Sequence, residues 1–259
     1  MTRSLDPVAE AAWARVGDAE RYERSRPGYP PQAIAIAARA LGLGPDSRVA
    51  DVAAGTGKLT RAIASAASEV VAIEPSAGMR AVLARAVPGA QVLAGTAEAL
   101  PLPAGCVDAV VVGDAFHWFD GPAALREFAR VLRPGGGVAL LWNAADLDGE
   151  DWWERVKAVL RREVESDAGG GRYESMRWRE AFDARDSPFE TLGHEQIEWS
   201  EEATGDEIAG YIGTWSVVSS LEAGRRTRLL AELRETLGPG PLTRPRRTIV
   251  WHTSLKGAA

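Results

Sequence analysis

The sequence predicts an α/β protein with a mostly parallel sheet of seven strands, helices on both faces and a helical cap insertion. Three observations support this fold class. Between residues 48 and 143, short apolar runs alternate with segments of helical periodicity, as in consecutive βαβ units. A glycine turn at residues 55–57 follows the first run. Two further candidate strands lie late in the chain and would complete the sheet.

Five apolar runs define the first part of the sheet. Several are apolar at consecutive positions, which is typical of parallel strands that are covered on both faces. The runs cover residues 48–53, 70–74, 91–93, 109–113 and 138–142.

Two helical stripes lie between these runs. Leu59, Ile63 and Ala67 recur every four residues, and residues 125–132 carry apolar side chains at i, i+3, i+4 and i+7. The second helix should end at residues 133–137, because proline cannot continue a helix and glycine tolerates the turn. This order of elements predicts a Rossmann-like fold.

The segments outside this core follow other patterns. Residues 8–43 are expected to be helical, and residues 151–167 form a charged amphipathic pattern that ends at the glycines of residues 168–171. Residues 172–194 have no clear period and suggest an inserted cap. Further expected elements are a strand at 196–199, helices at 206–216 and 221–237, and a strand at 246–255. We expect an N-terminal helical segment (residues 1–45), a ligand-binding core (46–145), a cap insertion for the substrate (146–195), and the C-terminal part of the core sheet with its helices (196–259).

The glycine turn discriminates between classes of ligand. A buried strand runs into a loop with Gly55 and Gly57 and then into a helix, so a ligand can approach the backbone closely. A dinucleotide fingerprint requires a third glycine where Thr60 stands. A phosphate-binding P-loop requires glycine and a hydroxyl residue where Val52 and Leu59 stand. Both phosphate-binding interpretations are therefore weakened.

Two carboxylates accompany this turn. Asp51 would repel a pyrophosphate, whereas it can bind a ligand ammonium group and favour a nearby sulfonium. Glu74 lies 17 positions beyond Gly57, at the expected end of the neighbouring strand, where it can accept hydrogen bonds from ribose hydroxyls. The alternative is that Asp51 caps the loop and Glu74 caps the next helix. Together the two acids favour a nucleoside ligand with a local positive charge.

Several segments resemble the successive motifs of class I S-adenosylmethionine-dependent methyltransferases. The resemblance covers residues 22–143, with a looser match at residues 248–253. Its motifs are Asp51-Val-Ala-Ala-Gly-Thr-Gly57, Val71-Ala-Ile-Glu-Pro-Ser-Ala-Gly-Met79, Gly95-Thr-Ala-Glu-Ala-Leu-Pro101, Asp108-Ala-Val-Val-Val-Gly-Asp114 and Glu127-Phe-Ala-Arg-Val-Leu-Arg-Pro-Gly-Gly136. The run His117-Trp-Phe119 and the segment at residues 22–30 are similar to the trans-aconitate-methyltransferase-like (methyltransferase type 11) branch.

The resemblance implies S-adenosyl-L-methionine as cofactor. Gly55 and Gly57 would lie near its methionine part, Arg26 would bind its carboxylate, and Glu74 its ribose. At Thr96 this sequence departs from many relatives, which have aspartate there, so the contact to the adenine amine is in doubt. The complete expected cofactor set is Tyr22, Arg26, Asp51, Ala53, Gly55, Gly57, Glu74, Pro75, Met79, Thr96, Ala97, Asp114 and Ala115.

Aromatic residues define the expected acceptor side. Tyr29, His117, Trp118 and Trp142 are the expected substrate-binding residues. His117 follows a strand end and could remove a proton from the acceptor, or else it shapes the pocket without acting as a base. Methyl transfer from a sulfonium mainly requires alignment and exclusion of water, so no catalytic triad is expected.

Tryptophan is abundant in the C-terminal half of the chain. Its residues there are expected to line an acceptor pocket under the cap, or to fill the seam between cap and core. They include Trp152, Trp153, Trp178, Trp215 and Trp251.

The composition narrows the class of partner. A net charge of −6 and a pI near 5.3 disfavour nucleic acid and membrane surfaces, and the expected partner is a small-molecule methyl acceptor. Two arginine clusters, at residues 225–228 and 244–247, are expected to be solvated surface rather than anion sites. The single Cys106 cannot form an internal disulfide and no apolar leader or span occurs, so we expect a cytoplasmic monomer or homodimer without metal.

Three other functions stay open at this stage. The same cofactor site could run a different reaction, such as intramolecular cyclisation of the cofactor, or it could belong to a non-catalytic module that binds cofactor and signals through the cap. A nicotinamide-dependent oxidoreductase is disfavoured by Asp51 and Thr60.

Overall fold

A seven-stranded sheet organises the computed structural model, which describes residues 16–145, 147–163 and 176–257. The strands lie in the order β3-β2-β1-β4-β5-β7-β6. The strands β3, β2, β1, β4 and β5 are parallel to one another, and β7 is antiparallel to both β5 and β6. They are β1 (Arg48–Val52), β2 (Glu69–Ile73), β3 (Gln91–Leu93), β4 (Val107–Gly113), β5 (Leu132–Ala145), β6 (Gly193–Thr204) and β7 (Pro241–Ser254). The predicted Rossmann-like, mostly parallel sheet is confirmed.

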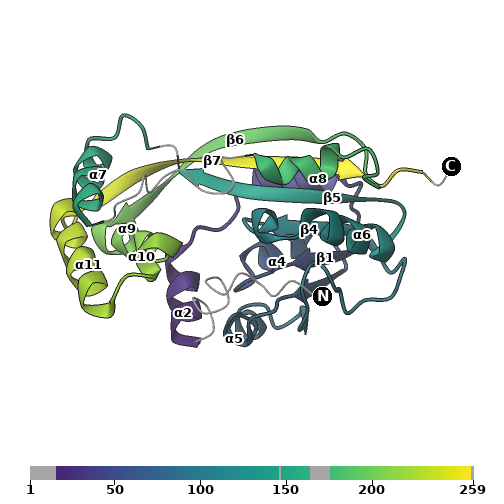
Figure 1. Ribbon diagram of the computed structural model, residues 1–259, viewed down its shortest axis with the longest axis horizontal. Coiled ribbons are helices and arrows are strands. Elements are labelled where there is room, and N and C mark those ends of the chain that lie inside the picture. The colour runs from purple at the N-terminus through teal and green to yellow at the C-terminus, as the bar shows by residue number, and fades with distance from the viewer. Residues whose placement is uncertain (1–15, 146, 164–175, 258–259) are drawn as a thin grey trace.

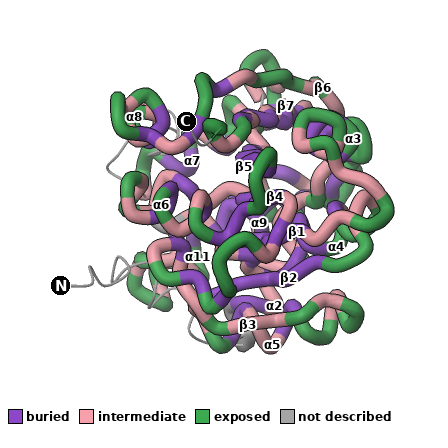
Figure 2. The backbone as a smooth tube through the Cα atoms, turned by 90° about the vertical axis from the view of Figure 1, so that its right-hand side faces the viewer, coloured by how far each residue is buried: buried purple, intermediate pink, exposed green. Residues whose placement is uncertain are grey.

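Helices cover both faces of the sheet because its central strands are apolar on both sides. Val49 packs with α3 (Pro31–Ala40) and α4 (Lys58–Ile63), whereas the next residue, Ala50, belongs to the cluster of α6 (Gly121–Val131) on the opposite face. This alternation follows from the two-residue period of a strand. Figure 2 shows the resulting buried centre around β4 and β5.

The strand order creates a switch point between β1 and β4. The chain leaves β1 toward β2 and β3 on one side, and it leaves β4 toward β5 on the other. In open α/β sheets, ligands bind beyond the carboxyl ends of strands at this point. Asp51 and Asp114 lie at these two strand ends, so the topology brings residues 63 positions apart to one edge of the sheet.

Four helices form a separate layer that we call the helical unit. It comprises α7 (Asp151–Glu163), α9 (Gly205–Ile212), α10 (Ser216–Ser219) and α11 (Ala223–Leu237). The unit lies beyond the end of β5, near α2 (Val16–Ser25), and thus at the carboxyl edge of the parallel strands (Figure 1). Its own apolar cluster joins Val156, Ile208 and Leu233 from three of the helices.

The helices predicted between residues 151 and 237 are present, but their ends differ from the predicted ones. The single helix expected at 206–216 is two helices, because α9 ends at its C-cap, Gly213, and α10 starts at Ser216. A capping box of Thr204 and Glu207 starts α9. The glycine break expected at 168–171 lies outside the described residues.

The segment predicted as a cap, residues 146–195, packs in two different parts of the molecule. Its helix α7 joins the helical unit, whereas α8 (Glu180–Asp183) and the preceding turn place Trp178 and Phe182 in the cluster of Phe116 on the α6 face of the sheet. The division into residues 146–195 and 196–259 stays a prediction. Spatially, α7 groups with the helices of residues 205–237.

One prediction about the arginine clusters is wrong. Arg244 and Arg246, expected on the solvated surface, are 5% and 2% exposed. They alternate on β7 with more exposed neighbours and point into the space beneath the helical unit. In contrast, Arg225 and Arg228 on α11 are exposed, as expected. None of the described helices is both long and apolar enough to span a bilayer.

Candidate active site

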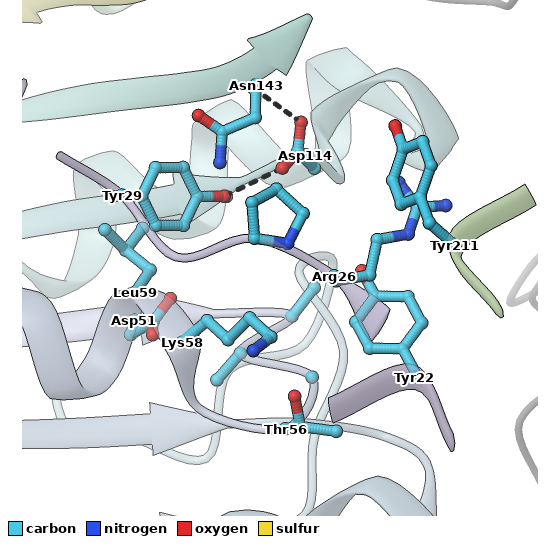
Figure 3. Close-up of a pocket in the computed structure, with 15 residues that line it drawn as sticks. Tyr22, Arg26, Tyr29, Asp51, Thr56, Lys58, Leu59, Asp114, Asn143 and Tyr211 are labelled. Carbon is cyan, nitrogen blue, oxygen red and sulfur yellow. Dashed lines mark hydrogen bonds between the residues drawn. The ribbon is translucent and has the colours of Figure 1, made fainter. Parts of the chain in front are cut away.

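A cavity opens at the carboxyl ends of β1 and β4 (Figure 3). It lies at the switch point of the sheet, between the glycine loop and the segment that follows α2. Its walls are formed by Tyr22, Arg26, Pro27, Tyr29, Asp51, Ala53, Ala54, Gly55, Thr56, Lys58, Leu59, Gly113, Asp114, Asn143 and Tyr211.

The loop after β1 has the backbone geometry of a ligand-binding turn. Gly55 and Gly57 have φ angles of 58° and 89°, in the left-handed region that favours glycine. A Cβ on Gly57 would also lie 3.0 Å from Leu83 Cγ, so this position is closed to a side chain. Ala53 adopts φ 56° without being glycine, and such strain concentrates at functional sites.

Asp51 is a buried carboxylate with one unused oxygen. Its Oδ2 accepts a hydrogen bond of 2.6 Å from Thr60 Oγ1, whereas Oδ1 has no hydrogen-bond partner among the described residues. Burial raises the pKa of Asp51 to about 7, and the charge of Glu74 adds to this rise. An unsatisfied buried acceptor at a cavity wall is costly, and a cationic donor would satisfy it. The arrangement therefore suits a positively charged ligand.

Glu74 is fixed by the glycine loop itself. Its Oε2 accepts from the backbone N–H of Gly55 at 2.9 Å, and its Oε1 accepts from the backbone N–H of Ser76 at 2.8 Å. Burial raises the pKa of Glu74, while these two hydrogen bonds act in the opposite direction. The side chain lies outside the lining of this cavity. Each oxygen keeps a second acceptor position, so a ribose contact stays a prediction.

Asp114 is held in a strained conformation at the end of β4. Its φ is 51°, and its carboxylate accepts from Tyr29 Oη at 2.9 Å and from the backbone N–H of Asn143 at 3.0 Å. Tyr29 can approach only because Gly113 has no side chain, since a Cβ there would lie 2.4 Å from the phenol oxygen. Burial raises the pKa of Asp114, opposed first by the charge of Arg26.

Arg26 lies between two aromatic rings at the mouth of the cavity (Figure 3). Its guanidinium carbon is 5.2 Å from the ring centroid of Tyr22 and 5.0 Å from that of Tyr211, within the range of cation–π attraction. Its Nε donates to Thr214 Oγ1 at 3.0 Å. These contacts connect the N-terminal segment to the helical unit, 188 residues further along the chain.

Glu23 fastens α2 to the glycine loop. Its carboxylate accepts from Thr56 Oγ1 at 2.6 Å and from Arg61 Nη2 at 2.8 Å, and it lies 3.4 Å from Lys58 Nζ. Burial would raise the pKa of Glu23, but these neighbours together lower it. The N-terminal helix is thus part of the site wall, as the predicted site residues Tyr22 and Arg26 implied, whereas Glu23 was not predicted.

The predicted cofactor residues fall into two groups. Those that line the cavity together are Tyr22, Arg26, Asp51, Ala53, Gly55 and Asp114. Those outside its lining are Gly57, Glu74, Pro75, Met79, Thr96, Ala97 and Ala115. Within the second group, Met79 is 4% exposed and packs with Ala19 and Tyr22 beneath α2. The cavity therefore comprises the predicted methionine side of the site, and the adenine side stays a prediction.

The predicted acceptor residues also fall into two groups, inside and outside the cavity lining. Tyr29 lines the cavity, whereas His117, Trp118 and Trp142 do not. Trp142 Nε1 donates to His117 Nδ1 at 3.4 Å. A neutral imidazole that accepts at Nδ1 carries its proton on Nε2, where it can donate but cannot take up another proton. This geometry favours a positioning role for His117 over that of a base.

The five named tryptophans of the C-terminal half lie in two places, and their role at an acceptor pocket stays a prediction. Trp152, Trp153 and Trp215 line a smaller cavity within the helical unit. Trp178 and Trp251 instead belong to the core cluster, with ring centroids 5.5 Å apart.

Sequence reasoning missed several lining residues, chiefly Lys58, Asn143 and Tyr211. Asn143 could have been found, because it directly follows the apolar run at residues 138–142, at the same sheet edge as Asp114. For Tyr211, no sequence pattern indicates a place at the site. It is an ordinary apolar position of α9, and only the pairing of β6 and β7 brings that helix to the cavity.

The fold and the glycine-loop site define a class I methyltransferase, and comparisons with known proteins agree. Residues 50–140 match the family model described as a methyltransferase domain. An uncharacterized methyltransferase of Mycobacterium tuberculosis (strain ATCC 25618 / H37Rv) is 36% identical, over 85% of this chain and 84% of its own length. An uncharacterized methyltransferase-like protein of Schizosaccharomyces pombe is 32% identical, over 84% and 83%. The chain belongs to the methyltransferase family.

Solved structures show the same architecture. A candidate type II methyltransferase from Anaeromyxobacter dehalogenans superposes with a TM-score of 0.59 at 24% identity, covering 90% of this chain and 97% of that one. The cofactor of the class is S-adenosyl-L-methionine. The cavity residues fit this molecule, since Oδ1 of Asp51, which has no partner among the described residues, suits a cationic group.

Proposed function

We propose that this protein transfers the methyl group of S-adenosyl-L-methionine to an oxygen, nitrogen or carboxylate of a small-molecule acceptor. The buried carboxylate of Asp51, with one oxygen unpartnered among the described residues at the cavity wall, is the observation that carries the proposal. The similarity of His117-Trp-Phe119 to the trans-aconitate-methyltransferase-like branch supports a small acceptor.

The proposed roles of the cavity residues follow from their chemistry. Asp51 binds the ammonium group of the cofactor, and Arg26 binds its carboxylate, so the two ends of the amino acid meet opposite charges. The backbone at Gly55 lies against the methionine chain, and Glu74 binds the ribose. Asp114 forms the floor, where Tyr29 and Asn143 fix its orientation.

When bound, the cofactor supplies an electrophilic methyl group on a good leaving group. The protein then has to hold the acceptor in line and exclude water. We propose that the helical unit is the cap of this site, because it lies over the carboxyl edge of the strands and contributes Tyr211 to the cavity (Figure 1). We propose that His117, whose Nδ1 accepts from Trp142, shapes the acceptor side of the site and does not act as a base.

Calorimetry and an acceptor screen test the proposal. S-adenosyl-L-methionine should bind in the micromolar range, which corresponds to about −8 kcal/mol, and NAD should give no measurable heat. A screen with isotopically labelled methyl donor, read by mass spectrometry, should yield S-adenosylhomocysteine together with a methylated small molecule. Heat with NAD alone would overturn the proposal. Cofactor breakdown products without a methylated acceptor would identify a different reaction at the same site.

A further inference from the structure

Thr60 stands at the position where a dinucleotide fingerprint has its third glycine. It lies in the first turn of α4 and is fully buried. In a helix, the hydroxyl of threonine often donates to a carbonyl of the preceding turn. Thr60 Oγ1 instead donates across the glycine loop to Asp51 Oδ2, at 2.6 Å. This contact joins the end of β1 to the start of α4.

The two carboxylates beside the glycine loop are held in different ways. Glu74 has a backbone N–H donor at each oxygen, from Gly55 and from Ser76. Asp51 is fully buried, yet its Oδ1 has no hydrogen-bond partner among the described residues. A buried acceptor without a partner costs free energy, so a ligand donor at Oδ1 would be stabilising. Thr60 thus occupies one oxygen of Asp51 and leaves the other for a ligand.

The same contact favours the charged form of Asp51. Burial raises the pKa of Asp51 and the charge of Glu74 adds to the rise, whereas the hydroxyl and the backbone of Thr60 lower it. The other titratable groups that line the cavity with Asp51 are Tyr22, Arg26, Tyr29, Lys58, Asp114 and Tyr211. These groups are the same in the wild type and in a variant of Thr60. A comparison of the two proteins at equal pH therefore isolates the effect of the hydroxyl.

We propose that Thr60 is a positioning residue for cofactor binding, because its hydroxyl holds one oxygen of Asp51 and leaves the other available to the ammonium group of the cofactor. This inference rests on the proposed function, since it concerns the same cofactor site. Without the hydroxyl, Asp51 keeps its proton to higher pH, and a protonated carboxyl group attracts a cation less strongly. A role in packing alone would not couple cofactor affinity to pH in this way.

The binding of S-adenosylhomocysteine at different pH values tests this role without turnover. Thr60→Val removes the hydroxyl and keeps a β-branched side chain of similar size. By calorimetry, the full-length variant should bind about 10-fold more weakly than the wild type at pH 6, because a hydrogen bond to a charged group shifts the proton loss by about one pH unit or more. The difference should narrow toward pH 9, where Asp51 is ionised in both proteins. Thr60→Ser keeps the hydroxyl and should restore the wild-type profile.

A second buried threonine provides the matched control. Thr253 donates to the backbone carbonyl of Glu190 and pairs with Val138, nearer the amino ends of the parallel strands. Thr253→Val should bind S-adenosylhomocysteine like the wild type at pH 6 and at pH 9. The neutral nucleoside 5′-methylthioadenosine lacks the amino-acid part of the cofactor, so it should bind Thr60→Val and the wild type equally. A wild-type affinity of Thr60→Val for S-adenosylhomocysteine, or a deficit of equal size at both pH values, would overturn the inference.

A titration by nuclear magnetic resonance separates this inference from the proposed function. In the cofactor-free protein, the carboxyl carbon of Asp51 is assigned with Asp51→Asn and followed from pH 5 to 9. Its midpoint should rise by about one pH unit or more in Thr60→Val. If Thr60→Val does not fold, as judged by circular dichroism, Thr60→Ala removes the same hydroxyl without adding atoms and replaces it.

The two measurements together show which proposal fails. An unchanged midpoint in the folded variant, with cofactor bound by the wild type, contradicts the role of Thr60 alone. A raised midpoint without any binding of S-adenosylhomocysteine or S-adenosyl-L-methionine contradicts the proposed methyl transfer, and with it the positioning role in cofactor binding, but leaves the pairing of Thr60 with Asp51 in place.

Discussion

The two walls of the site are built in different ways. The wall formed by the ends of β1 and β4 is local in sequence: strand, glycine turn and helix follow one another, and Asp51 and Gly57 are six residues apart. The opposite wall depends on long-range pairing, because the antiparallel strands β6 and β7 bring α9 and its Tyr211 to it. In the proposed function, the first wall binds the methyl donor and the second wall belongs to the cap.

A side chain at Gly57 should have the largest effect on the glycine-loop wall. Gly57→Val would place a branched side chain at φ 89° and within about 3 Å of Leu83, so the loop must shift. We expect loss of detectable cofactor binding and a melting temperature lowered by several degrees, measured by calorimetry and circular dichroism. Gly89→Val, at an exposed turn with open space around it, is the control. If Gly57→Val binds the cofactor with wild-type affinity, the glycine loop is not part of the cofactor site.

Removal of the Glu74 carboxylate should have the next largest effect. Glu74→Ala deletes the acceptor of two backbone N–H groups and the proposed ribose contact, which predicts cofactor binding weaker by about 10- to 100-fold. Glu74→Gln keeps the shape of the side chain and should recover part of the affinity. If both variants bind the cofactor with the wild-type dissociation constant, Glu74 does not contact the cofactor.

The pH dependence of binding should be smaller and directional. Because burial raises the pKa of Asp51 to about 7, most of the carboxyl group is protonated at pH 6, and a cationic ligand must displace that proton. Cofactor affinity should therefore fall by up to about 10-fold per pH unit below 7 and level off above pH 8. Calorimetry in buffers of different ionisation enthalpy should detect proton release. An affinity that does not change between pH 6 and 8 would contradict this.

Loss of the His117 imidazole should have the smallest effect on chemistry. Since Nδ1 accepts from Trp142, the ring is not poised to take a proton, and His117→Ala should raise KM more than it lowers kcat. The pH profile of kcat should keep its wild-type shape. Loss of a limb of that profile would show that His117 is a base.

The sequence predicted the β1 to β5 half of the fold well, for a physical reason. Parallel strands covered on both faces are apolar at consecutive residues, and the helices between them show a clear period. The same local order placed Asp51 and Asp114 at one edge. Ala53 and Asp114 were predicted as site residues. Their left-handed φ angles were not predicted, because neither residue type by itself indicates that conformation.

The other half could not be read in the same way. Arg244 and Arg246 look like surface arginines in sequence, and their burial depends on the register of β7 against β6 and on the helices above it. Tyr211 joins the site for the same reason. Tertiary packing sets the strand register in a long antiparallel pair, and this packing cannot be predicted from the local pattern of one sequence.

The central claim is that an ionised Asp51, buried at the glycine loop, selects a cationic nucleoside. Asp51→Asn is the most direct test, with calorimetry of S-adenosyl-L-methionine and thermal unfolding both measured at pH 8. Because burial disfavours the ionised carboxylate, the variant should melt a few degrees higher than the wild type at this pH. It should also bind the cofactor about 10- to 100-fold more weakly. Wild-type affinity in the folded variant would contradict the claim.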